Sequence, residues 1–181
     1  RRVLFRSGAA RVLLMGIGKT GSLDAGGARK ALTAALGQIR ATGATDAVIL
    51  ADGMTVKDRD TAWLLRQSGM LAETGAYRYT RTLSKPEPAP RLTRLAVGLA
   101  GKAARTATRA LAEGAAIGRG MNLARELGNT PANICTPSHL ADQARALARR
   151  HAKPRCRVLD EKQRSEEHTS ELQSPCNLVC R

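Results

Sequence analysis

Short apolar runs alternate along this chain with segments whose apolar residues recur at helical spacing. Arg11–Met15 and Asp46–Leu50 are apolar runs, closed by Gly16 and by Asp52-Gly53, and such runs are typical of buried strands. Between them, Ala28–Arg40 repeats apolar residues every three or four positions, which predicts an amphipathic helix. Strands that alternate with helices predict an α/β fold with a largely parallel sheet.

The rest of the chain continues this alternation after one interruption. The segment Ser84–Pro90 carries three prolines in five positions, and we expect a loop there because proline supports neither a ladder nor a helix interior. The other predicted elements are a helix over 58–77, a strand over 92–99, a helix over 103–127, a helix over 138–151 and a strand over 155–159.

The stretch from Asn122 to Ala141 predicts the end of one helix, a stiff polar connector and the start of another helix. Gly128-Asn129 is a helix stop signal, and Pro131 disfavours helix in the residue before it. Thr136 can cap a new helix that has Pro137 at its first position.

This stretch resembles the junction between the two domains of leucyl (cytosol) aminopeptidases, which in that family reads roughly N-x-A-R-E-L-x-N-x-P-x-N-x-x-T-P-x-x-L-A. The matching residues are Asn122, Ala124, Arg125, Glu126, Leu127, Asn129, Pro131, Asn133, Thr136, Pro137, Leu140 and Ala141. The resemblance extends over residues 8–163 and is weakest between Gly21 and Arg94, where only the pattern agrees. It implies a three-layer N-terminal α/β domain similar to macro domains over residues 8–102, a linker helix over 103–129, and the start of a second, catalytic α/β domain over 130–163.

The resemblance also implies an activity for the protein as a whole. Members of this family are metal-dependent aminopeptidases that release N-terminal amino acids from peptides. Two divalent ions, Zn or Mn, are held by carboxylates and a lysine and activate a water. The ligands lie in motifs of the type F-D-x-G-G and N-T-D-A-E-G-R, and neither motif occurs in this chain. We therefore expect no catalytic, cofactor-binding or metal-binding residue here, and an active parent protein that is a cytoplasmic hexamer acting on peptides.

Seven residues at each end of the chain are related by the genetic code. Arg164–Ser170 can be encoded by AGATCGGAAGAGCACACGTCT, and the opposite strand of that DNA encodes Arg1–Ser7 in order. A common sequencing-library adapter accounts for both segments, and its continuation accounts for Glu171–Ser174 and fits the residues that follow. We therefore expect residues 1–7 and 164–181 to be adapter-derived and exclude them from fold reasoning. Residues 8–163 are then expected to be a piece of a longer reading frame.

Composition limits the other classes of function. The formal net charge is +15, which favours polyanions, but the arginines are dispersed through an Ala- and Gly-rich chain, as a GC-rich genome produces. DNA binding, which some bacterial members of the family show, and nucleotide or ADP-ribose binding by analogy with macro domains stay open as alternatives. The few aromatic residues argue against a base-stacking platform, and no apolar run approaches the ~20 residues of a membrane span.

Several smaller motifs favour structural roles. Gly16–Gly21 spells G-x-G-x-x-G after a predicted strand, but the next helix is predicted to begin only near Ala28 and no acidic residue follows at the spacing of a dinucleotide site, so we interpret it as a turn. The remaining candidates lack partners at ligand or triad spacing, and we expect ordinary surface or packing roles for them: His139, His151, Cys135 and the pair Asp160-Glu161.

Overall fold

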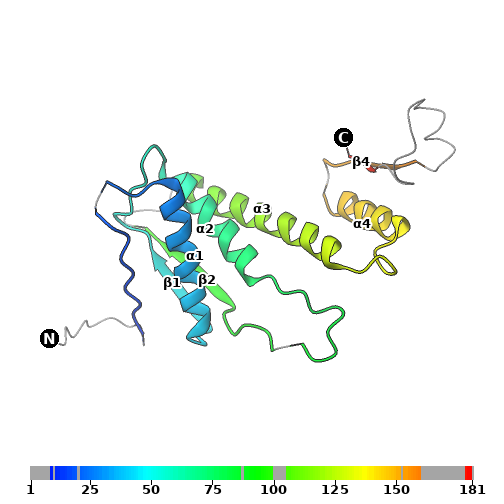
Figure 1. Ribbon diagram of the computed structural model, residues 1–181. Coiled ribbons are helices and arrows are strands. Elements are labelled where there is room, and N and C mark those ends of the chain that lie inside the picture. Colours follow the sequence, from blue (N-terminus) through cyan, green and yellow to red (C-terminus); the bar gives the residue numbers. More distant parts are fainter. Residues whose placement is uncertain are drawn as a thin grey trace. The chain divides into compact units, whose positions relative to one another are not determined.

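A computed structural model describes residues 9, 11–19, 21–86, 88–99, 105–151, 153–159 and 178–180 of the chain (Figure 1). The chain divides into two compact units, residues 1–123 and 124–181, which are described separately below. In chain order the elements are α1 (Ala25–Ala41), β1 (Asp46–Leu50), α2 (Thr61–Ala76), β2 (Arg94–Gly98), α3 (Arg105–Asn129), α4 (Pro137–Arg150), β3 (Cys156–Val158) and β4 (Leu178–Cys180).

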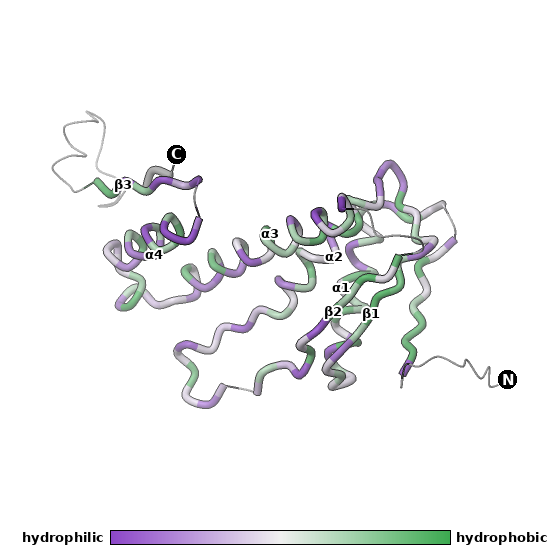
Figure 2. The backbone as a smooth tube through the Cα atoms, turned by 180° about the vertical axis from the view of Figure 1, so that it is seen from behind, coloured by the Kyte–Doolittle hydropathy of each residue, from purple (hydrophilic) through white to green (hydrophobic). Residues whose placement is uncertain are grey.

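The first unit is built on two parallel strands joined by a helix. β1 pairs with β2 in register from Asp46 opposite Arg94 to Leu50 opposite Gly98, and α2 forms the crossover between them. The strands are the hydrophobic centre of this unit in Figure 2. The predicted α/β class with a parallel sheet is therefore confirmed.

The core of the first unit lies between this sheet and the two helices α1 and α2. Its buried side chains are aliphatic, as the scarcity of aromatic residues requires, and they are Leu23, Ala28, Leu32, Ala51, Val56 and Leu64. Trp63, Leu71 and Val97 pack against this cluster. Burial of apolar area at about 25 cal/mol per Å² makes such a cluster the main source of stability for the unit.

Both core helices begin at an aspartate that closes the first turn. The Asp24 carboxylate accepts a hydrogen bond from the Gly27 N–H at 2.6 Å, and the Asp60 carboxylate accepts one from the Trp63 N–H at 2.7 Å. These bonds satisfy N–H groups that have no partner inside a helix. The predicted helix over 58–77 therefore begins later than expected, at Thr61, after its cap.

Helices α2 and α3 approach each other through glycines. A Cβ atom added at Gly114 would collide with the Arg66 carbonyl group, and one added at Gly118 would lie 2.8 Å from the Met70 carbonyl oxygen. On the facing helix, a Cβ at Gly69 would meet the backbone of Leu111 and Ala115. Only residues without a side chain allow the two backbones to come this close.

The second unit contains α4 and a short antiparallel pair. Thr136 caps α4, its hydroxyl accepts a hydrogen bond from the His139 N–H at 3.3 Å, and Pro137 occupies the first helical position, as predicted. β3 confirms the predicted strand over 155–159 and pairs with β4, with Cys156 opposite Cys180. β4 lies within residues 164–181. These residues were expected to be adapter-derived and were excluded from fold reasoning, so no strand was predicted there.

Two predictions for the sheet are wrong. Residues Arg11–Met15 were predicted to be a buried strand, but they are extended without backbone hydrogen bonds among the described residues, and Leu14 is 84% exposed. This segment runs along the side of β1 away from β2 (Figures 1 and 2). One of its contacts is with the end of α1, where an Arg11 guanidinium nitrogen donates to the Thr42 carbonyl oxygen at 2.6 Å.

The second error concerns how deeply β1 is buried. Its side chains alternate between half-buried and exposed, with Val48 61% and Leu50 79% exposed. The helices cover one face of the sheet, and no described residue covers the face that carries Val48 and Leu50. An apolar run therefore predicted the strand but not which of its faces is covered.

Candidate functional site

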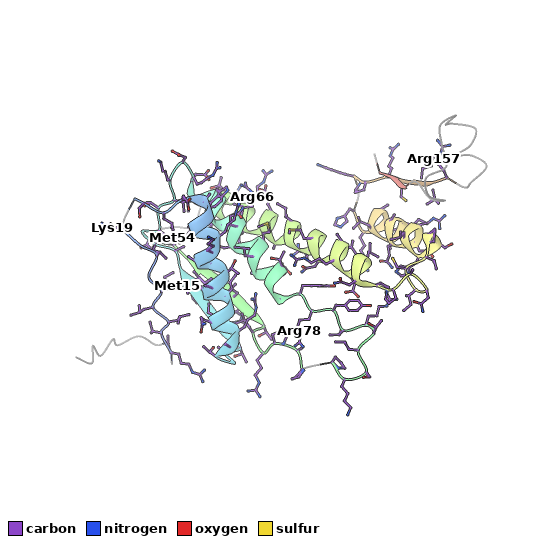
Figure 3. The ribbon with its side chains drawn as sticks, in the orientation of Figure 1. Met15, Lys19, Met54, Arg66, Arg78 and Arg157 are labelled. Carbon is purple, nitrogen blue, oxygen red and sulfur yellow. The ribbon has the colours of Figure 1, made fainter. Side chains whose placement is uncertain are left out.

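The glycine-rich turn at residues 16–21 leads toward a helix whose N-terminus is already occupied. Gly18 and Gly21 have φ angles of +89° and +79°, and the Ser22 N–H donates to the Lys19 carbonyl oxygen at 3.1 Å, which closes the turn (Figure 3 labels Lys19). The Asp24 carboxylate then caps α1 at the position where a bound pyrophosphate would need free N–H groups. A carboxylate there repels a phosphate, so the geometry favours the predicted structural turn over a dinucleotide site.

The junction motif begins on α3 with a residue that holds α2. The Asn122 side-chain nitrogen donates to the Glu73 carbonyl oxygen at 2.9 Å. Glu73 lies in the last turn of α2, where the helix runs out of N–H donors for its carbonyl oxygens, and Asn122 supplies a side-chain donor there. The sequence identified Asn122 only as a match to the motif, because its partner lies 49 residues earlier in the chain.

Charged side chains reinforce the contact between α2 and α3. Glu113 on α3 accepts hydrogen bonds from Arg109 at 2.9 Å and from Arg66 on α2 at 3.1 Å (Figure 3 labels Arg66). These hydrogen bonds, that of Arg109 first, lower the pKa of the Glu113 carboxyl group below its ordinary value. Glu73 on α2 forms a further ion pair with Arg119 at 3.0 Å.

In the second unit, the connector of the motif is fixed by its own backbone. The Thr130 hydroxyl donates to the Glu126 carbonyl oxygen at 2.6 Å, and the amides of Ile134 and Cys135 both donate to the Pro131 carbonyl oxygen. These bonds form a tight turn between the end of α3 and the cap of α4. The stiff connector predicted from the two prolines is therefore present.

The titratable residues singled out in the sequence do not assemble into a site. Within the described ranges, no three His, Cys, Asp or Glu side chains lie together in a group that could hold a metal ion. His139 and Cys135 are half-buried, and His151 is exposed at the end of α4. Asp160 and Glu161 lie outside the described residues.

A hollow of about 300 Å³ lies in the first unit beside β2. Apolar side chains of β2, α2 and α3 make most of its wall, together with the segment that precedes β2. Arg40, at the end of α1, is a charged residue in this wall, and one of its guanidinium nitrogens donates to the Ala72 carbonyl oxygen at 3.0 Å. Burial lowers the pKa of Arg40 from its ordinary value. The hollow could not be predicted from the sequence, because three helices and a strand contribute to it.

None of the helices that the structure describes combines the length and the apolar character needed to cross a bilayer.

Comparison with known proteins places these features in a family. The profile of the N-terminal domain of the cytosol aminopeptidase family matches residues 2–86, and the profile of the catalytic domain of the same family matches residues 122–174. Both matches reach into the terminal segments that the sequence analysis set aside. The second match begins at Asn122, the first residue of the junction motif.

Curated relatives give the same result. The chain is 47% identical over 156 residues to a protein of Alkalilimnicola ehrlichii named "Probable cytosol aminopeptidase", with 85% of this chain and 31% of that protein covered. It is 40% identical to a protein of the same name from Halorhodospira halophila, with 82% and 30% covered. The chain thus spans about a third of the length of these relatives.

Solved structures agree in fold. The bottromycin maturation enzyme BotP in complex with Mn is 31% identical, with a TM-score of 0.64 over 83% of this chain and 30% of that one. A mutant of tomato leucine aminopeptidase is 20% identical, with a TM-score of 0.68 over 81% of this chain and 29% of that one, which is a likeness of fold. Two domain profiles in tandem, the second of which begins with the junction motif, show that the chain belongs to the cytosol aminopeptidase family.

Proposed function

We propose that this chain is the N-terminal part of a leucyl aminopeptidase that releases N-terminal amino acids from peptides. The observation that carries the proposal is the tandem order of the two family matches, the first ending before α3 and the second beginning within it, with the junction motif at the start of the second match. In this proposal residues 8–102 are part of the N-terminal domain, 103–129 the linker helix and 130–163 the start of the catalytic domain, with adapter-derived segments at both ends.

The proposed enzyme uses two divalent metal ions, Zn or Mn, which activate a water for attack on the first peptide bond. The Mn in the structure of the related BotP supports the use of a divalent metal. The described residues of this chain do not fit such a centre, because they bring no three metal-ligating side chains together. The family's motifs F-D-x-G-G and N-T-D-A-E-G-R do not occur in the sequence, so in this proposal the metal ligands and catalytic residues belong to the rest of the parent protein.

The proposal includes the setting in which the enzyme works. The names of the relatives support a location in the cytosol, and the family resemblance supports a hexamer. DNA binding is a second proposal, supported by the basic charge: of the formal net charge of +15, residues 8–163 carry +13, because residues 1–7 contribute +3 and residues 164–181 contribute −1. If phosphate contacts drive it, retardation of duplex DNA by the full-length protein must weaken steeply as salt rises, and its absence at low salt would remove this proposal.

The experiment compares the chain with the complete reading frame of its gene. Hydrolysis of a leucine amide substrate is measured with added Mn or Zn, beside a sample treated with a chelator. We expect metal-dependent turnover by the complete protein and none by the chain. Turnover by the purified chain would show that the active site lies within this chain, contrary to the proposal. A complete protein that releases no N-terminal residue from any peptide would contradict the assignment as an aminopeptidase.

A further inference from the structure

One row of residues along α3 changes in size in a defined order. Residues four positions apart lie on the same face of a helix, and this row contains Ala110, Gly114, Gly118 and Asn122. The first three are buried, and the side chain of the fourth donates to a carbonyl oxygen of α2. Two positions without a side chain are therefore bounded at each end by a position that carries one.

Successive members of this row meet successive carbonyl groups of α2. A Cβ added at either glycine would lie against such a group, at 2.8 Å in the case of Gly118, and the Asn122 side-chain nitrogen donates to the next group at 2.9 Å. Along both helices the pairs are Gly114 with Arg66, Gly118 with Met70, and Asn122 with Glu73. The residue numbers rise together, so the two helices run in the same direction along this contact.

The order of the row leaves α3 a single register on α2. If α3 moved one turn toward the start of α2, Asn122 would face the Met70 carbonyl group, where there is no room for a Cβ atom. If α3 moved one turn the other way, Ala110 would face the Arg66 carbonyl group, with which a Cβ atom collides. Either shift forces a side chain into a backbone group that cannot give way.

The ion pairs beside this row agree with the same register. Arg66 on α2 pairs with Glu113 at 3.1 Å, and Glu73 on α2 pairs with Arg119 at 3.0 Å. A shift of one turn would separate both pairs, but partly exposed pairs of this kind contribute little on their own. The fit of the row and the hydrogen bond of Asn122 therefore determine the register, and the ion pairs add to it.

We propose that Ala110 and Asn122 lock the register of α3 on α2, and that Asn122 does so both by its size and by its donor. The match to the catalytic domain of the family begins at Asn122, whereas Glu73, which accepts its hydrogen bond, lies in the match to the N-terminal domain. The lock thus holds the first residue of one family domain at a fixed point on the other. It depends on contacts within the first unit and not on the proposed peptidase activity.

The test measures this register in the full chain. Spin labels are attached at Thr61→Cys, at the start of α2, and at Met121→Cys, on α3, after the four cysteines of the chain are replaced by serine. Both labelled positions are exposed. Pulsed double electron–electron resonance then gives the distribution of distances between the labels, and a shift of one helical turn changes the distance by about 5 Å. With Ala110 and Asn122 in place, we expect one maximum.

Two glycine variants should release the lock in opposite directions. Asn122→Gly removes the donor and the side chain, so α3 can move one turn toward the start of α2, and a second, shorter distance is expected. Ala110→Gly permits the opposite movement, and a second, longer distance is expected. Asn122→Ala loses the hydrogen bond but keeps a Cβ atom, and it should retain the single distance.

Ala116→Gly is the matched control. It introduces the same helix-weakening residue at an exposed position of α3, away from the row, and should show one distance. A second distance in this control would show that glycine acts by loosening the helix. A single distance in either variant of the row, a shift of the same sign in both, or broadening without a second maximum would also overturn the proposal.

Discussion

At the scale of single residues, the contact between α2 and α3 depends on three glycines and a small set of polar side chains. The glycines allow backbone approach, and Asn122, Arg66 and Glu113 fix the two helices relative to each other. The sequence showed glycines inside two predicted helices, where glycine is unfavourable by about 1 kcal/mol relative to alanine. Only the packing explains them, because the residues that meet come from distant parts of the chain.

Gly114→Ala is expected to lower the free energy of unfolding of the first unit by about 1–3 kcal/mol. The added methyl group would collide with the Arg66 carbonyl group and force the two helices apart. Gly120→Ala is the matched control on the same helix, since a Cβ there meets nothing within 4 Å, and it should be neutral or stabilising by up to about 1 kcal/mol. Urea denaturation followed by circular dichroism measures both, and equal effects would contradict the close packing.

Glu113 should make stability depend on pH in the acid range. Its folded-state pKa is lowered by the hydrogen bonds of Arg109 and Arg66, below the ~4.3 of an unfolded glutamate. The contribution is therefore present above the unfolded pKa and is lost as the pH falls through the folded pKa. Glu113→Gln should flatten the fall in melting temperature over this acid range. Parallel pH profiles of the two proteins would exclude the ion-pair network as a contributor.

At the scale of elements, periodicity predicted type and order well and boundaries less well. The four helices that the structure describes, and the strands β1, β2 and β3, lie where the apolar patterns placed them. The start of α2 was predicted at residue 58, but Asp58 has a φ of +57° in the turn before the helix, and Asp60 is the residue that caps it. β4 was not predicted, because residues 164–181 were excluded from fold reasoning as adapter-derived.

Asp60→Ala is expected to destabilise the first unit by about 1 kcal/mol, because the first turn of α2 loses its side-chain acceptor. Asp60→Asn keeps an oxygen in the same place and should retain most of the stability, which separates capping from charge. Thermal melting and amide hydrogen exchange of Trp63 measure the two effects. If the alanine and asparagine variants melt together, the hydrogen bond to Trp63 does not stabilise the helix.

At the scale of the whole molecule, the sequence predicted the family and fold class but not the surfaces that this chain leaves uncovered. The junction motif has a local signature and could be found directly in the sequence. The exposure of Arg11–Met15 and of one face of β1 could not be found that way, because an apolar run indicates that a surface needs cover and does not say whether the cover is present. The hollow beside β2 depends on packing among several elements and was equally out of reach.

The uncovered face of the sheet should make the chain associate with itself. Val48 and Leu50 are exposed side by side on β1, and together with Leu14 and Val12 they present apolar area that water disfavours. The double variant Val48→Thr with Leu50→Lys keeps the strand facing the same core but makes this face polar. Size-exclusion chromatography with light scattering over a range of concentrations should show oligomers for the unmodified chain and a shift toward monomer for the double variant.

Leu83→Lys, at a loop position that is 52% exposed, is the control and should associate as the unmodified chain does. A chain that stays monomeric at every concentration, or a control that dissociates as fully as the double variant, would show that this face does not drive association.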